Sequence, residues 1–397
     1  MNDFQGRLKN IFLIYILLLI TFSFLLIPNN DSYSYLSWSQ NLQLSYFDGP
    51  PMIAYAIRLF TTFFGNSTLA INLTGVFVAL LSALVITQII KTLTDNSKMG
   101  LAVALLWITY PFITRYLFLN VTYDALETLF NLLVLLFALK YIKFRQIKYI
   151  YCIGIAAGCL LLSKYSGIIS LSALIGYFIF KRELRPIFKS YHFYLSILIC
   201  IIIFMPVIIW NYEHNWASFL FQLKYHVWGN QAKVSKANDI HGIMKVWYYI
   251  GNGVIGSLVA YWVILIYLFT KKQLANKIKQ IPYTQKLMLD LILTLIIAIF
   301  LFWFILSPFC RVNIIYMLYF TTLVIIFAGY WLLQYNYTRA ILFIILISAT
   351  ISIVKLAKYS IVPSDNVTFK QNTIDKKVKS YSPFNEYINK RISQKKN

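Results

Sequence analysis

Long apolar runs separated by short polar segments dominate the chain. A membrane-spanning helix needs about 20 predominantly apolar residues, and runs of this kind recur up to residue 356. The pattern predicts an all-α integral membrane protein with about 11 transmembrane helices. The expected spans cover residues 8–28, 68–90, 99–117, 123–142, 148–163, 166–180, 190–210, 246–270, 287–306, 314–334 and 339–356.

The spans expected at residues 148–163 and 166–180 are short. One helix over both would be about 50 Å long, which exceeds a hydrocarbon core of about 30 Å. Basic clusters flank the pair on both outer sides, and both clusters favour the cytoplasm. We therefore predict two helices with Lys164 at an outward turn. Gly154 and Gly158, four residues apart on the first of them, predict close packing against another helix.

The distribution of charge sets the orientation. Hydrophobic residues make up 59% of the chain and charged residues 12%, while the formal charge is +23. The basic residues lie in short clusters between apolar runs, as the positive-inside rule predicts, so a nucleic-acid partner is not expected. With the N-terminus inside, residues 1–356 form one membrane domain with outer loops at 29–67 and 211–245. The basic polar tail, 357–397, would then lie outside.

The first outer loop contains two carboxylates, Asp31 and Asp48, although the whole chain has only 13 acidic residues. Asp31 could simply cap a helix, and Asp48 could be a turn residue. Asp124, with Glu127 three residues later, also fits a helix start. After the double proline, the pattern of apolar and polar residues over 52–65 has the spacing of an amphipathic helix. We expect this helix to lie in the membrane interface.

Six acidic residues share the predicted outer face. They are Asp31, Asp48, Asp124, Glu127, Glu213 and Asp239. Ionisable groups at membrane depth are costly and usually functional. This one-sided collection therefore predicts a shared site at the outer surface.

The motifs of the first outer loop carry a family resemblance. They comprise Asp31, Ser34, Tyr35, Trp38, Ser39 and Gln40, followed by Tyr46, Phe47, Asp48, Pro50 and Pro51. Together they resemble the bacterial branch of the protein O-mannosyltransferase superfamily, which includes lipid A aminoarabinose transferases. Three later stretches also match: Thr122 to Asp124, Leu161 to Gly167, and Pro206 to Gln222. The resemblance covers about the first 225 residues in the family's order.

Two positions depart from the family pattern. Ser32 follows Asp31 where the family usually has a second acid. Gly49 follows Asp48 where aminoarabinose transferases carry a lysine. Any phosphate contact from that lysine position must therefore come from another residue.

The resemblance implies a C-type glycosyltransferase fold with interfacial helices in the first outer loop. It also implies transfer of a sugar, with inversion, from a polyprenyl-phosphate donor on the extracytoplasmic face of a bacterial inner membrane. The expected acceptor is lipid A or another envelope glycolipid. A protein O-glycosyltransferase or a polysaccharide-modifying enzyme of the same family is the alternative. A polytopic transporter is the second alternative, but neither sequence repeats nor a midplane charge cluster favours it.

This chemistry gives each candidate residue a role. A carboxylate must take the acceptor proton, and we expect Asp31 as that base. Asp48 would orient the acceptor, bind a metal or act as an alternative base, and Asp124 completes the catalytic set. The donor phosphate would be held by Lys164, Arg311, Arg58 and Tyr46. The acceptor or sugar would meet Tyr35, Trp38, Glu213 and Trp216.

No cofactor is assigned with certainty from the sequence. A divalent ion could bridge carboxylate and phosphate, with Asp48, His226 and His214 as candidate ligands. The two histidines lack a fixed helical spacing, so they also fit polar residues of the membrane interface. The four cysteines lack metal-like spacing and support no disulfide framework.

Overall fold

A computed structural model describes residues 2–28, 30–119, 121–223, 280–306, 314–335 and 337–360. Within these ranges the regular structure is helical, and the one β contact is an isolated bridge between Tyr46 and Gly49. The span expected at 246–270 lies outside the described residues. So does the tail from residue 361 onward.

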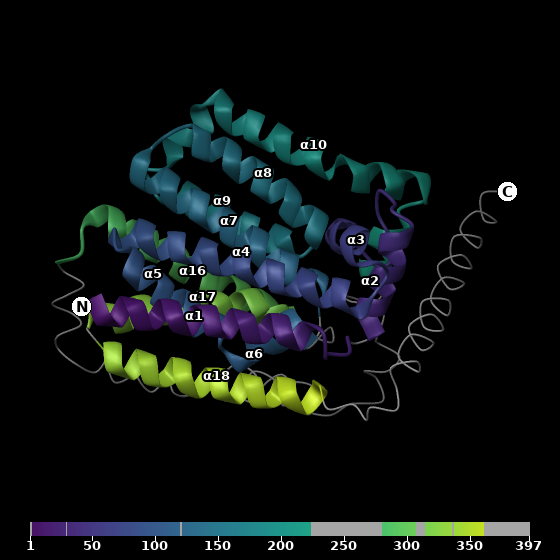
Figure 1. The fold of residues 1–397 in the computed structure, drawn as a ribbon. Coiled ribbons are helices and arrows are strands. Elements are labelled where there is room, and N and C mark those ends of the chain that lie inside the picture. Colours follow the sequence, from purple (N-terminus) through teal and green to yellow (C-terminus); the bar gives the residue numbers. More distant parts are fainter. Residues whose placement is uncertain are drawn as a thin grey trace, which may run out of the picture.

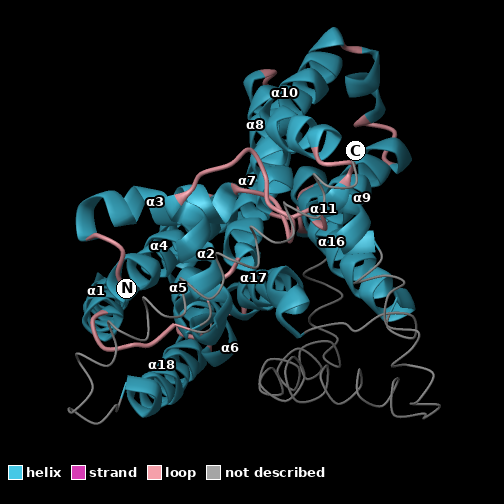
Figure 2. Cartoon of the chain, turned by 90° about the vertical axis from the view of Figure 1, so that its right-hand side faces the viewer, coloured by secondary structure: helices cyan, strands magenta, loops and turns pink. Residues whose placement is uncertain are grey.

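The described helices form a bundle in which the long helices lie side by side along one common direction (Figure 1). The long helices are α1 (Asn2–Ser23), α4 (Thr68–Thr94), α7 (Tyr123–Phe144), α10 (Tyr191–Glu213), α16 (Tyr283–Leu306), α17 (Leu318–Gln334) and α18 (Thr338–Ser360). Shorter ones are α5 (Ser97–Ile108), α6 (Pro111–Thr114), α8 (Lys148–Ser163) and α9 (Gly167–Phe180). Figure 2 shows the same bundle turned by 90°.

The expected spans other than 246–270 all correspond to helices in the described part of the chain. Seven of these helices are long and apolar enough to cross a membrane, and α5 with α6 could form an eighth span. The helices α8 and α9 have 16 and 14 residues, in agreement with the two short spans predicted. The chain is therefore an all-α, multi-pass membrane protein.

The span expected as one helix over 99–117 is instead broken, which corrects the prediction. Its two parts, α5 and the segment Pro111–Phe118 that begins with α6, meet at an angle of 61°. Pro111 lacks an N–H and disfavours helical backbone in the residue before it, and Tyr110 accordingly has φ −66° and ψ 125°. Ser352 of α18 donates a hydrogen bond of 2.8 Å to the Thr109 carbonyl at the break. A distant helix thus helps to hold the bend.

The first outer loop folds into two short helices, α2 (Asn30–Gln40) and α3 (Met52–Phe64). Both lie at the end of the bundle where α10 finishes (Figure 1). On α3, the buried side chains include Ile53 and Ile57, whereas Leu59 and Phe63 are exposed. The prediction of an amphipathic helix in this loop is therefore confirmed.

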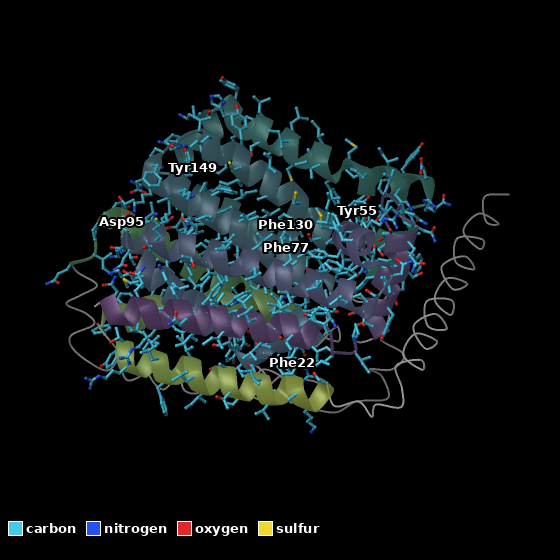
Figure 3. All side chains as sticks on the ribbon, in the orientation of Figure 1. Phe22, Tyr55, Phe77, Asp95, Phe130 and Tyr149 are labelled. Carbon is cyan, nitrogen blue, oxygen red and sulfur yellow. The ribbon has the colours of Figure 1, made fainter. Side chains whose placement is uncertain are left out.

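The opposite end of the bundle contains exposed ion pairs. Lys143 pairs with Asp95 at 2.6 Å, and Lys181 pairs with Asp290 at 2.8 Å. Figure 3 shows Asp95 and Tyr55 at opposite ends of the bundle, Tyr55 being on α3. The basic clusters and the first outer loop therefore lie at different ends, as the predicted orientation requires.

The glycines of α8 allow a close approach to α10. A Cβ atom added at Gly154 would lie 2.4 Å from the main-chain oxygen of Ser196, and one at Gly158 would lie 2.7 Å from Cβ of Ile203. Both distances are shorter than real contacts. The close packing predicted from the spacing of these glycines is confirmed, because no larger residue fits without a shift of backbone.

We expect Gly154→Ala to destabilise the protein by about 1–3 kcal/mol, since the added methyl group overpacks the α8–α10 contact. Gly176→Ala on α9 is the matched control, because an added Cβ there meets nothing within 4 Å. Its gain in helix propensity should leave the thermal midpoint in detergent equal or higher. Equal loss of stability in the two variants would contradict the packing argument.

Candidate active site

Asp31 lies in the first turn of α2. The segment between α1 and α2 is fixed by Asn72 of α4. The side-chain amide of Asn72 donates hydrogen bonds of 2.9 Å to the Ser23 carbonyl and 3.0 Å to the Leu26 carbonyl. Asp31 is exposed. Even so, partial burial of its carboxyl group and the charge of Asp124 raise the pKa of Asp31. Asp31 is therefore an accessible carboxylate beside a second acid.

Ser32 connects α2 to the chain just before α7. Its buried hydroxyl donates a hydrogen bond of 2.9 Å to the main-chain oxygen of Val121. Because Asp31 and Asp124 lie close to these two residues in sequence, the bond brings the two carboxylates together. Ser32 occupies the position at which the family usually has a second acid, and in this chain it makes a structural contact.

Asp48 lies in a tight turn between Tyr46 and Gly49. The main-chain N–H of Tyr46 donates to the Gly49 oxygen at 3.1 Å, and that of Gly49 donates to the Tyr46 oxygen at 3.2 Å. Burial, together with the charge of Asp31, raises the pKa of Asp48 to about 7. A carboxyl group with such a pKa changes protonation near neutral pH, which suits a general base.

The aromatic residues of the loop form its interior. The rings of Tyr35 and Trp38 lie 5.2 Å apart, Trp38 stacks on Tyr46 at 4.3 Å, and Tyr35 contacts Tyr123 at 5.2 Å. The Tyr46 hydroxyl donates to the Trp38 carbonyl at 2.9 Å. All three loop side chains are buried. The rings pack against one another and, through Tyr35, against Tyr123 of α7. A sugar contact of Tyr35 and Trp38 and a phosphate contact of Tyr46 stay predictions.

A buried ion cluster joins the start of α7 to the turn between α8 and α9. Lys164 bonds to Asp124 and lies 3.5 Å from Glu127. The Asp124 carboxylate also accepts a hydrogen bond of 3.1 Å from Thr122, and Glu127 accepts one of 2.6 Å from Ser166. The outward turn predicted at Lys164 thus places its ammonium group between two acids.

In this ion cluster two acidic side chains, Asp124 and Glu127, flank one ammonium group. The Lys164 nitrogen also lies 4.3 Å from the centre of the Tyr316 ring, at the start of α17. The Lys164 ammonium group thus contacts two carboxylates and an aromatic ring. Asp124 was predicted from its motif, whereas Tyr316 was not, because nothing in its local sequence marks it.

The end of α10 that lies near α2 and α3 presents some of the predicted ligand-contacting residues. Glu213 is exposed, and Trp216 is 44% exposed. The ring of His214 stacks on Trp210 at 4.0 Å, and its Nδ1 is 2.7 Å from the Trp210 carbonyl. Glu213 and Trp216 are therefore accessible, whereas Tyr35 is buried.

Within the described residues, no group of three or more His, Cys, Asp or Glu side chains is placed to hold a metal ion. Two of the candidate ligands, Asp48 and His214, are described. The third, His226, lies outside the described residues. A metal ion in this site therefore stays a prediction, and the described residues provide no complete set of ligands for it.

The remaining predicted cation, Arg58, is exposed on α3. Arg311, Asp239 and the outer loop beyond residue 223 lie outside the described residues. An exposed cation that the sequence reading missed is Arg115, in the π-helical turn η1 (Arg115–Leu119) between α6 and α7. Its guanidinium carbon is 5.6 Å from the centre of the Tyr116 ring. The break before α6, which was not foreseen, determines its position.

Comparison with known proteins confirms the resemblance seen in the motifs. The family model described as dolichyl-phosphate-mannose-protein mannosyltransferase matches residues 48–210. A curated relative, lipid A galacturonosyltransferase RgtD of Rhizobium johnstonii, is 26% identical over 193 residues, which are 47% of this chain and 38% of the relative. The chain thus spans well under half of that relative's length.

Solved membrane glycosyltransferases share the fold. ArnT from Cupriavidus metallidurans bound to undecaprenyl phosphate matches with a TM-score of 0.65 and 15% identity, over 98% of this chain and 76% of that one. Its apo structure matches with a TM-score of 0.62 and 16% identity, over 82% of this chain and 59% of that one. The Archaeoglobus fulgidus oligosaccharyltransferase matches with a TM-score of 0.53 and 15% identity, over 88% and 53%. The chain therefore has the C-type glycosyltransferase fold.

Proposed function

We propose that this protein transfers a sugar from a polyprenyl-phosphate donor to a hydroxyl or phosphate of an envelope glycolipid, with lipid A as the first candidate acceptor. The reaction takes place at the bundle end that holds α2 and α3, which we assign to the periplasmic side of the inner membrane. The relative named as a lipid A galacturonosyltransferase supports this class of acceptor. The similar ArnT structure bound to undecaprenyl phosphate supports this class of donor.

One observation carries the proposal: three carboxylates from separate segments meet at this end. The charge of Asp124 acts on Asp31, and the charge of Asp31 acts on Asp48. Repulsion among acids is unfavourable for folding. A role as proton acceptors next to a sugar donor would explain why the three carboxylates lie close together despite this repulsion.

The chemistry follows from these groups. A carboxylate, Asp31 in this proposal, takes the proton from the acceptor oxygen, which attacks the anomeric carbon of the donor from the side opposite the phosphate. The bond between that carbon and the phosphate oxygen breaks, so the sugar is transferred with inversion and polyprenyl phosphate leaves. Asp48 orients the acceptor or substitutes as base. Lys164, with Arg58 and Arg311, would stabilise the charge on the leaving phosphate.

The proposal is tested with purified protein in liposomes that contain a synthetic polyprenyl-phosphate sugar and lipid A. We expect loss of the donor and the mass increase of one sugar on lipid A. Nucleotide sugars in the absence of a lipid carrier should give no product. Turnover with a nucleotide sugar alone would overturn the donor assignment. Donor consumption without modified lipid A, but with modified protein or polysaccharide, would favour the alternative acceptors.

The pKa of Asp48 predicts a pH dependence. Its raised pKa means that the carboxyl group is mostly protonated below about pH 7 in the folded protein. If ionised Asp48 assists the reaction, kcat/KM should fall about tenfold for each pH unit below that value. Asp48→Asn should abolish this acidic limb. An unchanged profile in that variant would remove Asp48 from the pH dependence.

A further inference from the structure

The turn that contains Asp48 is contacted by the segment that follows α10. The amide nitrogen of Gln222 donates a hydrogen bond of 2.5 Å to the main-chain oxygen of Asp48 itself. The ring of Phe221 packs on Phe47 at 4.6 Å. Gln222 follows α11 (Ala217–Phe221), a short helix of the second outer segment. Two segments more than 170 positions apart in the chain therefore meet at one turn.

Two further contacts connect the same segments. The indole N–H of Trp210 donates to the Gln43 side-chain oxygen at 3.2 Å. The hydroxyls of Tyr165 and Ser218 share a hydrogen bond of 2.9 Å, and Tyr165 also lies 3.5 Å from the hydroxyl of Ser45. The loop that contains Asp48 is thus held at Gln43 and Ser45, just before the turn, as well as at the turn itself.

The chain adopts an unfavourable conformation to reach the Asp48 turn. Asn215 and Trp216 have φ values of 53° and 60°, in the left-handed region that bulky residues rarely adopt. This reversal joins α10 to α11 and is held by the main-chain N–H of Trp216, which donates to the Asn211 oxygen at 2.6 Å. Such conformations cost about 1 kcal/mol or more each and persist where the surroundings enforce them.

We propose that Gln222 is a positioning residue for the transfer reaction: its bond to the Asp48 main chain fixes where the Asp48 carboxylate points. Gln222 reaches the main chain of Asp48, so it acts through Asp48 and does not meet the reacting atoms itself. This inference rests on the proposed function, in which Asp48 faces the acceptor. Errors of about 1 Å in the placement of a catalytic group can lower a rate about 100-fold.

The first test compares three substitutions. Gln222→Met removes the hydrogen-bond donor at similar size, and Gln222→Glu replaces the amide by an acceptor of the same shape. We expect both to lower kcat by about 10-fold to 100-fold with little change in the KM for the donor. Gln222→Lys restores a donor and should recover most of the rate. Equal loss in all three variants, or a change in KM alone, would overturn the proposal.

A double substitution separates positioning from general stability. If Gln222 acts only through Asp48, Gln222→Met should change the residual rate of an Asp48→Asn protein by less than about twofold. Gln285→Met is the matched control, because Gln285 donates a comparable hydrogen bond of 2.6 Å to the Leu93 carbonyl at the other end of the bundle. It should leave kcat unchanged. Multiplicative effects at positions 222 and 48, or a drop in kcat for the control, would assign Gln222 a merely structural role.

A readout that needs no activity keeps this inference separate from the proposed function. A cysteine is introduced as Asp48→Cys after the four native cysteines are replaced, and its labelling rate with a thiol reagent is measured. Gln222→Met should change that rate several-fold, whereas Gln285→Met should not. An unchanged labelling rate contradicts the positioning role. If the labelling rate changes in a protein that shows no sugar transfer, the positioning role of Gln222 is supported and the proposed function is contradicted.

Discussion

Asp31→Asn is expected to lower the rate of sugar transfer by about 100-fold or more, because an amide cannot take the acceptor proton. The same change should leave folding intact. Asn has nearly the same size and shape as Asp, and the raised pKa of Asp31 shows that the folded protein disfavours its charge. The measurement is the initial transfer rate beside the thermal midpoint of the same preparation.

Asp31→Ala is the companion variant, since it removes both the carboxylate and the polar side chain from the first turn of α2. A catalytic base predicts equal loss of turnover in the two variants, with lower stability only for Ala. If Asp31→Asn keeps near-parental turnover while Asp31→Ala is merely unstable, the role of Asp31 is structural. The assignment of the base would then pass to Asp48.

Lys164→Met should be the most destabilising of the proposed substitutions, by about 3–5 kcal/mol, because it leaves uncompensated carboxylates in a buried site. The side chain of Lys164 is 13% exposed and that of Asp124 is 3% exposed. We expect low yield and a lower thermal midpoint. Lys164→Met combined with Asp124→Asn should recover part of the lost stability, since one of the two buried negative charges is also removed.

The control is a Lys–Asp pair at the other end of the bundle. Lys181 and Asp290 are 2.8 Å apart, with side chains 32% and 38% exposed. Water screens such a pair, so Lys181→Met should cost at most about 1 kcal/mol. Similar losses for Lys164→Met and Lys181→Met would show that burial does not set the energy of the first pair.

The sequence was sufficient to predict most of the architecture. Apolar runs locate spanning helices because only a helix satisfies its own backbone within lipid, and the basic clusters identify one end of the bundle. The pair Gly154 and Gly158 was informative for the same kind of reason, since four-residue spacing puts both on one face of a helix. The broken span was missed because its hydrophobicity is continuous, although Pro111 was a usable local signal.

The candidate site was predicted only in part. Asp31, Asp48, Asp124 and Lys164 stand out because charge is rare in this chain. The burial of Tyr35, Trp38 and Tyr46 was not foreseen, because exposed and buried aromatic residues look alike in a sequence. Gln222 carried no chemical signal of its own, since its role depends on a main-chain oxygen that only the folded chain brings near.

The bend between α5 and α6 bears on how the protein is made. One of its hydrogen bonds comes from Ser352, 243 residues further along the chain, and Trp107 just before the bend donates to Thr322 at 2.9 Å. Both partners leave the ribosome long after the bend has entered the membrane. The early helices must therefore wait in an incompletely bonded state, and the outer site can reach its final geometry only after α17 and α18 have been inserted.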